Sequence, residues 1–267
     1  MTGDAHRAAR AAEASPAMRT LARAGFAANG VVHILIGVLV LVVAFGGDGE
    51  SDQAGAFKAI GAAPLGFVAL WLLAIALWAL GLWHVLEGVL ARRDSTAAKW
   101  GTRVSEWGQA VVYIAFGVIA ASVALGARPN ADETAQDVSR GVLVIPGGVF
   151  VLGAVGLGIG IGGIVFVVRG LQRSFEKKMS IPSSTLGRAV TGLGVVGFIA
   201  KGVALLIVGV LLLVAAVRVD PSATGGLDAA IVALIEMPYG PILAGTVGGG
   251  LIVYGVFCIF RARYADL

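Results

Sequence analysis

The sequence predicts an all-α membrane protein whose six transmembrane helices form three parallel helical-hairpin repeats, with pseudo-threefold symmetry about the membrane normal. Its composition, its six long apolar segments and a two-helix unit that occurs three times together predict this fold. Of the 267 residues, 58% are hydrophobic and only 13% are charged, whereas soluble domains contain about 45–50% apolar and about 25% charged residues. This composition argues against a soluble enzyme, a disordered regulator and a nucleic-acid-binding module.

Six apolar segments are long enough to cross a bilayer, which takes about 20 residues of helix. They cover residues 26–45, 65–90, 107–125, 147–168, 193–217 and 242–260. They lack the period-two alternation of a β-barrel, and in lipid only a helix or a closed barrel satisfies every backbone amide. The first run is longer than the 7–15 residues typical of the apolar region of a signal peptide, so we expect a retained helix.

The distribution of Lys and Arg predicts the orientation. Most of the 20 basic side chains flank the N-terminal arm, the second and fourth connections and the C-terminus, while the opposite side holds only Lys58, Arg128, Arg140 and Arg218. We therefore predict a multi-pass protein of the cytoplasmic membrane with both termini in the cytoplasm. The net charge of +4 then reflects topology and contact with anionic lipid, and no nucleic-acid partner is expected.

Self-comparison reveals a unit of about 80 residues that occurs three times. Residues 25–33 (GFAANGVVH) match residues 197–205 (GFIAKGVAL), and a weaker copy lies around residues 103–113. Each second helix starts after a proline, in Pro64-Leu65-Gly66, Pro146-Gly147-Gly148 and Pro238-Tyr239-Gly240. The predicted organisation is a cytoplasmic arm (1–25) followed by repeats 26–93, 100–175 and 185–264. We expect residues 226–231, in the last connection, to form a short interfacial helix.

Each unit crosses the membrane twice, so all three have the same orientation and are related by an axis along the membrane normal. The repeat registers align two sets of glycines, which we expect at close helix contacts because small residues let backbones approach in lipid. These are Gly37, Gly117, Gly209, Gly81, Gly163 and Gly255. Two G-x-G-x-x-G matches, at 158–163 and 192–197, lack the strand–helix context of a dinucleotide site and fit helix packing better.

Polar residues inside the spans are the candidate functional residues, because they are costly in hydrocarbon. They concentrate near the predicted cytoplasmic ends and comprise Asn29, His33, His84, Glu87, Gln109, Arg169, Lys201 and Arg261. At 1.5 Å per residue, His33 and His84 are predicted at similar depth on antiparallel helices. Only the first repeat carries these two histidines.

Three interpretations of this polar cluster stay open. In the first, it is a structural collar: Glu87, Arg169 and Arg261 exchange hydrogen bonds and ion pairs, and Lys201 snorkels or pairs with Glu87. In the second, Glu87 and the histidines relay protons or cations. In the third, His33 and His84 bind a metal or a haem.

No nucleophile–base pair, phosphate loop or pair of carboxylates stands out, so we predict no catalytic residue, no metal site and no cofactor on motif grounds. The single cysteine, Cys258, excludes an internal disulfide. The leading functional hypothesis is a non-enzymatic membrane component that binds membrane lipids or a partner membrane protein. The alternative is a small-ion or proton permease that uses Glu87, His33, His84 and Lys201.

The pattern resembles a largely actinobacterial family of six-helix membrane proteins with a thrice-repeated two-helix domain of unknown function. The resemblance rests on Gly-x-x-x-[Asn/Lys]-Gly-Val in repeats one and three, on the Pro-x-Gly helix starts, and on the endings Gly255-Val256-Phe257 and Arg169-Gly170. It covers residues 19–264. Repeat two departs most, with Ala110 where the others have glycine. The resemblance implies the fold and supplies no catalytic residues.

Overall fold

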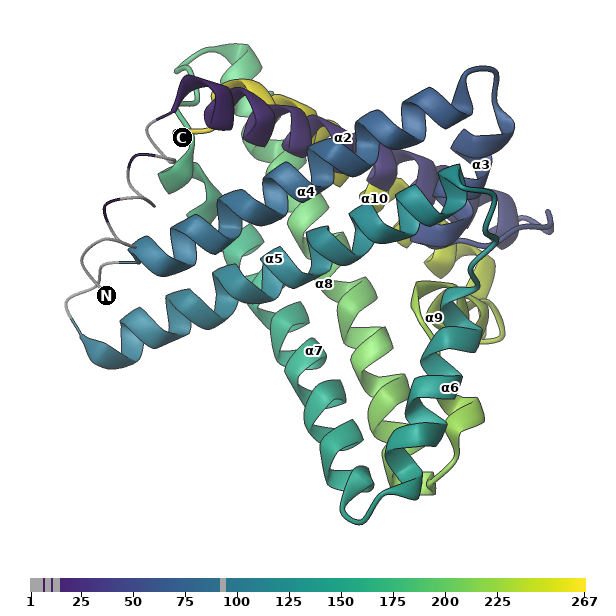
Figure 1. Ribbon diagram of the computed structural model, residues 1–267. Helices are drawn as coiled ribbons and strands as arrows, with labels where there is room; N and C mark the ends of the chain where they lie inside the picture. The colour runs from purple at the N-terminus through teal and green to yellow at the C-terminus, as the bar shows by residue number, and fades with distance from the viewer. Residues whose placement is uncertain (1–6, 8–10, 12–14, 92–94) are drawn as a thin grey trace.

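A computed structural model describes residues 7, 11, 15–91 and 95–267 and shows a bundle of long helices (Figure 1). Among these residues, six helices are long and apolar enough to span a membrane: α2 (Pro16–Ala44), α4 (Gly66–Leu90), α5 (Thr96–Ala124), α7 (Gly148–Leu171), α8 (Thr185–Arg218) and α10 (Gly240–Tyr264). Within the described ranges the only β pairing is an isolated bridge between Met179 and Ala265. The predicted all-α class and the six spans are confirmed.

The first helix starts earlier than the apolar run suggests. α2 begins at Pro16. Proline suits the first turn of a helix, because the backbone N–H that it lacks would have no hydrogen-bond partner within the helix at that position. Residues 16–25, predicted as the end of the cytoplasmic arm, therefore continue the first spanning helix. Most of the preceding arm lies outside the described residues.

Each repeat also contains a short helix between its two long ones: α3 (Gln53–Ala62), α6 (Ala131–Val144) and α9 (Leu227–Ile235). Only the third was predicted. Asp52 caps α3 by accepting a hydrogen bond from the Gly55 amide, and Asn130 caps α6 in the same manner, which stabilises otherwise marginal short helices. The three lie at one end of the molecule, opposite the C-terminus (Figure 1).

The Pro-x-Gly motif forms the turn that connects each short helix to the long helix that follows it. Its middle residue is left-handed in every repeat, with φ of 63° at Leu65, 81° at Gly147 and 62° at Tyr239. The glycine that follows packs against the carbonyl end of the short helix. A Cβ would collide with the backbone oxygens of Ile60, Val142 and Ile235 at Gly66, Gly148 and Gly240, respectively. The three repeats therefore share one turn geometry.

The closest helix pairs join successive repeats. α4 packs along α5, α7 along α8, and α10 along α2, while contact between the two long helices of one repeat is less extensive. Three equivalent pairs produce the predicted pseudo-threefold arrangement. The two helices of each predicted hairpin are consecutive in the sequence, but each packs mainly on a helix of a neighbouring repeat. α5 and α7, the long helices of the second repeat, diverge from each other (Figure 1).

All six glycines predicted at close contacts lie in these inter-repeat pairs. A Cβ built on Gly255 or Gly37 would come within 2.5 Å of the backbone oxygen of Gly30 or Gly248, across α2 and α10. The corresponding approach is 2.7 Å from Gly163 to the Gly202 oxygen and 2.9 Å from Gly209 to the Gly156 oxygen. The backbones of the α4/α5 pair are farther apart: a Cβ built on Gly81 would lie 3.2 Å from the Ala110 oxygen, and Gly117 packs against the Trp78 indole.

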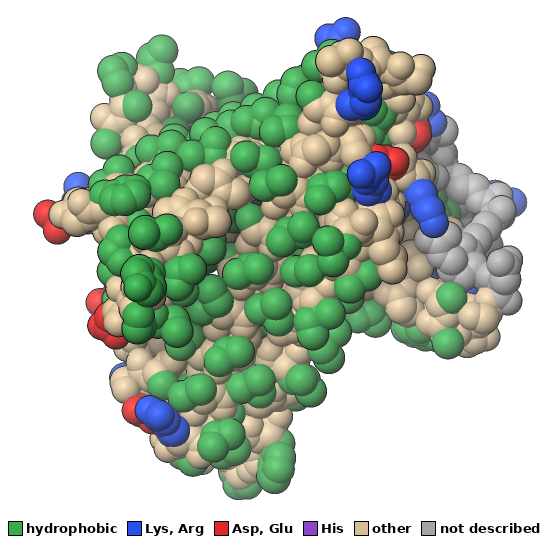
Figure 2. Space-filling model, turned by 180° about the vertical axis from the view of Figure 1, so that it is seen from behind, with side chains coloured by type: hydrophobic (Ala, Val, Ile, Leu, Met, Phe, Trp, Pro, Cys, Tyr) green, Lys and Arg blue, Asp and Glu red, His purple; other side chains and the backbone are tan. Residues whose placement is uncertain are grey.

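The surface separates apolar and charged side chains. Figure 2 shows a broad hydrophobic surface over the long helices and most of the visible Lys and Arg side chains gathered at one end. We call this end, which holds Arg169, Lys177, Lys178, Arg261 and Arg263, the basic end. The opposite end, with α3, α6 and α9, is called the acidic end and contains Glu50, Asp52, Asp132 and Asp228.

A half-buried carboxylate joins repeats one and three at the acidic end. Asp228 accepts hydrogen bonds from the Ser51 amide at 2.7 Å and from its hydroxyl at 2.6 Å, and neighbouring Asp52 is only 2% exposed. Burial raises the pKa of Asp52 to about 6, against the opposing effect of the hydrogen bond from Gly55, and the charges of Glu50 and Asp228 raise it further. The folded protein thus holds the Asp52 proton up to a higher pH than the unfolded chain does.

This raised pKa predicts a specific pH dependence. Below about pH 3 the carboxyl is protonated in both states. As the pH rises towards 6, the unfolded chain releases this proton first, so the free energy of unfolding falls. Asp52→Asn keeps an N-cap side chain and removes this fall. At pH 7 we expect the variant to be more stable by about 2–3 kcal/mol, and at pH 4 by only about 0.5 kcal/mol. Thermal unfolding in detergent at both pH values measures this, with exposed Asp48→Asn as control; equal gains at both pH values would contradict it.

Candidate functional site

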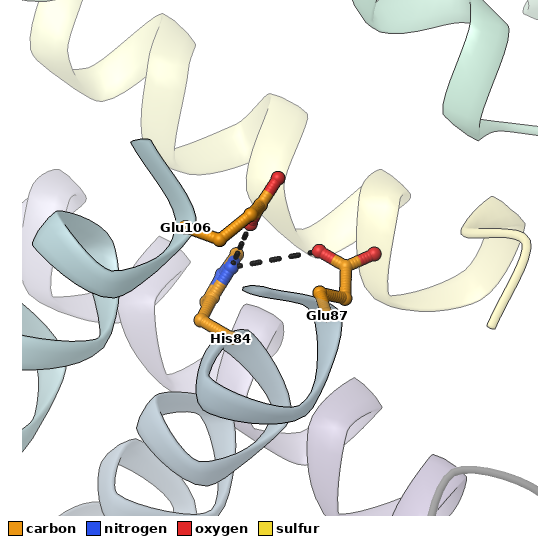
Figure 3. Close-up of side chains that lie close together, drawn as sticks. All are labelled: His84, Glu87 and Glu106. Atoms are coloured by element: carbon orange, nitrogen blue, oxygen red, sulfur yellow. Dashed lines mark hydrogen bonds and ion pairs between the residues drawn. The ribbon is translucent and has the colours of Figure 1, made fainter. Parts of the chain in front are cut away.

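A cluster of three ionisable side chains lies where α4 meets α5 at the basic end. His84 and Glu87 are one helical turn apart on α4 and share a face, and Glu106 on α5 faces them (Figure 3). His84 Nδ1 lies 2.7 Å from Glu106 Oε2 and 3.7 Å from Glu87 Oε2. His84 and Glu106 are buried, with 1% and 6% of their surface exposed, so this polar contact is formed away from water.

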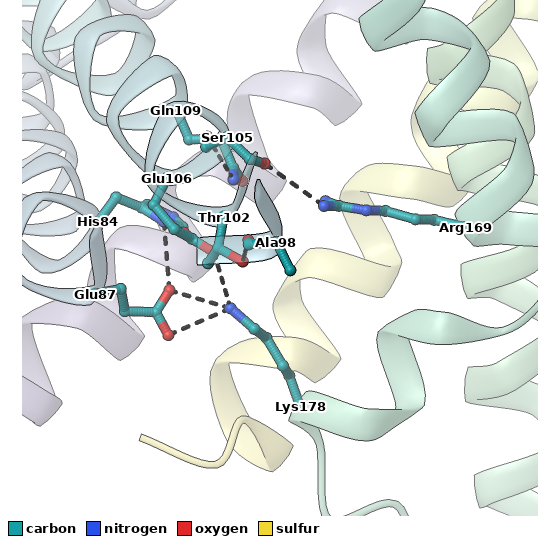
Figure 4. Close-up of polar contacts among 9 residues, drawn as sticks. All are labelled: His84, Glu87, Ala98, Thr102, Ser105, Glu106, Gln109, Arg169 and Lys178. Atoms are coloured by element: carbon teal, nitrogen blue, oxygen red, sulfur yellow. Dashed lines mark hydrogen bonds and ion pairs between the residues drawn. The ribbon is translucent and has the colours of Figure 1, made fainter. Parts of the chain in front are cut away.

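A lysine from the connection between α7 and α8 pairs with both carboxylates. Lys178 ends the short 3-10 helix η1 (Ser174–Lys178), and its Nζ lies 3.0 Å from Glu106 Oε1 and 3.2 Å from Glu87 Oε2 (Figure 4). Backbone hydrogen bonds to the C-terminal segment hold η1 in place: Ser180 N donates to the Tyr264 oxygen, and Asp266 N donates to the Lys178 oxygen. The site therefore combines side chains from repeats one and two with a strapped connecting segment.

A cavity of about 610 Å³ adjoins this cluster between α5 and α7. Its walls carry hydroxyl, amide, aromatic and cationic groups: Thr102, Ser105, Gln109, Phe166, Arg169, Phe175, Lys177, Lys178, Phe198, Tyr254 and Arg261, together with His84 and Glu106. Arg169 reaches from α7 towards α5, where its Nη2 lies 3.5 Å from the Ser105 hydroxyl (Figure 4). The diverging pair α5 and α7 thus encloses a polar space at the basic end.

The cavity has an excess of positive charge. Lys178 is paired with Glu87 and Glu106, but within the described part of the chain Arg169, Lys177 and Arg261 have no carboxylate within 4.0 Å. Arg261 instead lies over the Phe26 ring, 4.3 Å from its centroid, a favourable cation–π contact. Three cations without acidic partners therefore face a space that can hold an anionic group.

The predicted polar residues fall into two groups. His84, Gln109, Arg169 and Arg261 line the cavity, and Glu87 adjoins it through Lys178. The other three lie around Tyr254 and Cys258 of α10: Asn29 Nδ2 lies 3.5 Å from the Cys258 sulfur, His33 Nδ1 lies 2.8 Å from the Asn29 backbone oxygen, and Lys201 Nζ lies 4.5 Å from the Tyr254 ring centroid.

Two predicted pairings differ from the structure. Lys201 contacts Tyr254 and Phe166, whereas Glu87 pairs with Lys178. Lys178 belongs to η1, an irregular connection whose position cannot be predicted from helical periodicity. The two histidines also have different neighbours: His33 packs against Tyr254 and His84 stacks on Tyr113. Among the described residues, the cluster with metal-ligating geometry contains His84 and not His33.

The paired carboxylates Glu87 and Glu106 were not predicted, because they lie on different helices. The signal that could have found Glu106 is its place in the repeat: the register that aligns Tyr113 with His33 and Leu205 places Glu106 opposite Phe26 and Phe198. A carboxylate thus replaces an aromatic ring at one of three equivalent positions. Lys178 gave no such signal, since it lies in an irregular basic connection.

Fold and site together define a multi-pass membrane protein built from three copies of one two-span unit, with a polar cavity at its basic end. The chain belongs to the family described as Domain of Unknown Function DUF1206, whose model matches three times, at residues 24–91, 107–173 and 196–265. The resemblance predicted from the sequence is thereby confirmed.

One relative of this chain comes from Bacillus subtilis (strain 168). It is called "Uncharacterized protein YxxB", and it is 27% identical over 266 residues, covering 96% of this chain and 94% of that protein. The similarity therefore extends over all three repeats. Comparison with solved structures finds no match.

Proposed function

We propose that this protein is a non-enzymatic lipid-binding component of the cytoplasmic membrane, with both termini in the cytoplasm, and that its cavity binds the anionic headgroup of a phospholipid. The observation that carries the proposal is the cavity between α5 and α7, where Arg169, Lys177 and Arg261 have no acidic partner among the described residues. The orientation rests on the excess of Lys and Arg at the basic end.

The donors around the cavity suit a phosphate group. A guanidinium presents a planar fork of N–H groups that matches phosphate oxygens in pairs, and Arg169 lies beside the Ser105 hydroxyl at 3.5 Å. An ammonium such as that of Lys177 adds a point charge. The cytoplasmic leaflet is rich in anionic lipid, which basic residues near its surface attract by about 1 kcal/mol each.

The surroundings also suit acyl chains. The two helices α5 and α7 expose aliphatic side chains, among them Val112 and Ile114 on α5 and Ile164 and Val165 on α7. Phe166 and Tyr254 form part of the cavity wall. A phospholipid could therefore place its headgroup among the cations and its chains along two lipid-facing helices. A soluble anion would use the cations and leave these apolar faces to the bulk bilayer.

Lipid selectivity tests the proposal. We expect the protein, purified in a neutral detergent, to bind phosphatidylglycerol more tightly than phosphatidylcholine when lipid adducts are titrated by native mass spectrometry. Arg169→Gln should weaken phosphatidylglycerol binding about 10-fold, since a hydrogen bond to a charged group contributes about 1.5–3 kcal/mol. Phosphatidylcholine binding should change little.

Arg263→Gln is the matched control, because Arg263 is an exposed arginine on α10 outside the cavity lining. It should retain the affinity of the unaltered protein. Equal affinity for the two lipids, or equal losses in the two variants, would refute a headgroup site in this cavity. Inorganic phosphate that competes with phosphatidylglycerol at equal concentration would indicate a soluble anion as the ligand instead.

A further inference from the structure

We propose that His84, Glu87 and Glu106 form a binding site for a divalent transition-metal ion, of which Zn²⁺ is the best-matched representative. In the structure, the ammonium group of Lys178 occupies the position beside the two carboxylates that the metal charge would take. The proposal concerns cation binding and does not depend on the lipid proposal.

The donor set matches such an ion. One imidazole nitrogen and two carboxylate oxygens are ordinary zinc ligands, and three protein ligands leave a fourth position open. An imidazole together with carboxylates favours zinc, manganese or iron over magnesium, which prefers oxygen alone.

The geometry is close to that required. One potential ligand atom from each residue lies within 4.8 Å of the other two, and the ligand atoms around a tetrahedral zinc ion are about 3.3 Å apart. The two contacts of His84 Nδ1, at 2.7 Å to Glu106 and 3.7 Å to Glu87, lie on either side of that value. Rotation of the Glu87 side chain, which is 24% exposed, can supply the remaining movement.

The histidine is held in position and has a nitrogen to offer. Tyr113 stacks on its ring at 5.3 Å between centroids, and Phe26 contacts it edge-on at 6.4 Å. Nδ1 faces both carboxylates (Figure 3), and the buried Nε2 has no hydrogen-bond partner. In the metal-free protein Nδ1 carries the ring proton and donates it to Glu106. A cation that binds at Nδ1 takes the place of this proton, which moves to Nε2 or to solvent.

The two carboxylates of the α4/α5 pair are absent from the equivalent α10/α2 pair. In the α10/α2 pair, the positions that correspond to Glu87 and Glu106 hold Arg261 and Phe26, which form a cation–π contact at 4.3 Å. The α4/α5 pair has two carboxylates there, buried Glu106 and half-buried Glu87. Two negative charges this close to one another favour a cation beside them. The structure supplies that cation from outside the helix pair, through Lys178.

Lys178 can leave the site. Its side chain is 47% exposed, so the ammonium group can turn into solvent at small cost when a doubly charged ion takes its place. A metal can bind only the molecules in which Lys178 has left the site, so the apparent metal affinity is the intrinsic affinity multiplied by the fraction of such molecules. Removing this lysine should therefore tighten metal binding, whereas a lysine with a purely structural role would have no such effect.

The test is Zn²⁺ binding to tag-free protein in neutral detergent without added lipid, measured by isothermal titration calorimetry. We expect one zinc ion per chain, and Lys178→Gln should bind it about 10-fold more tightly. Glu106→Gln and Glu87→Gln, each in the Lys178→Gln background, should weaken binding by at least about 10-fold. Lys177→Gln, which removes the adjacent charge of η1, serves as the matched control and should leave zinc affinity unchanged.

Thermal unfolding provides a second measurement that reports on folding. With a chelator present, Lys178→Gln should unfold at a lower temperature than the unaltered protein, and Zn²⁺ should restore the difference, because a ligand that binds the folded state stabilises it. The proposal is overturned if zinc affinity is the same with and without the two glutamates, if Lys178→Gln binds zinc no more tightly than Lys177→Gln, or if a monodisperse Lys178→Gln protein binds no zinc. Loss of lipid selectivity alone would leave these results unaffected.

Discussion

Gly255→Leu should separate helices α2 and α10 and lower the free energy of unfolding by about 3 kcal/mol, at the upper end of overpacking effects in a close-packed interior. A Cβ at this position lies 2.5 Å from the backbone oxygen of Gly30 and 2.7 Å from a side-chain carbon of Ile34. Backbone cannot yield as a flexible side chain does, so the two helices must move apart along their contact. In lipid, that loss of van der Waals packing is not offset by a hydrophobic driving force between helices.

Thermal unfolding of the purified protein in detergent measures this effect. Gly249→Leu is a matched control on the same helix, because a Cβ at Gly249 meets no atom within 4 Å. We expect the control to stay close to the unaltered protein. If both variants lost equal stability, the effect would come from glycine in a helix in general, and close packing of α2 on α10 would not explain it.

The second large effect is expected at the cluster of His84, Glu87 and Glu106. Glu106→Ala removes the carboxylate that contacts both His84 and Lys178, and leaves the Nδ1 side of a buried imidazole without an acceptor. An unsatisfied buried polar group costs about 1–3 kcal/mol, so we expect a loss of about 2–3 kcal/mol in the free energy of unfolding. Lys178 retains its contact with Glu87 and therefore limits the loss.

Glu106→Gln separates the effect of the hydrogen bond from that of the charge, because the amide oxygen of the glutamine can still accept a hydrogen bond from His84 Nδ1. It should cost about 1 kcal/mol less than Glu106→Ala. Glu236→Ala, which removes an exposed acid at the other end of the molecule, should change stability by less than about 0.5 kcal/mol. Thermal unfolding of the three variants side by side provides the comparison, and a Glu106→Ala protein as stable as Glu236→Ala would exclude the cluster as a stabilising element.

The spanning helices and the repeat were predictable because their causes are local or periodic. About 20 consecutive apolar residues have a single stable arrangement in lipid, and three copies with an even number of crossings must face the same way. The Pro-x-Gly starts were recognised as motifs, and the structure adds their physical reason: a left-handed residue at Leu65, Gly147 and Tyr239, then a glycine against a carbonyl. Helices α3 and α6 were missed because helices too short to span a bilayer have no length requirement that identifies them.

The sequence by itself determined that this chain is an all-α membrane protein of three equivalent units, because hydropathy and repetition act along the chain. Only the tertiary structure decided which helices pair across repeats, that α5 and α7 stand apart around a cavity, and that Lys178 meets Glu87 and Glu106. The physical reason is that a charged contact between distant segments depends on where packing places their backbones. An irregular connection such as η1 carries no periodicity that could show its destination in advance.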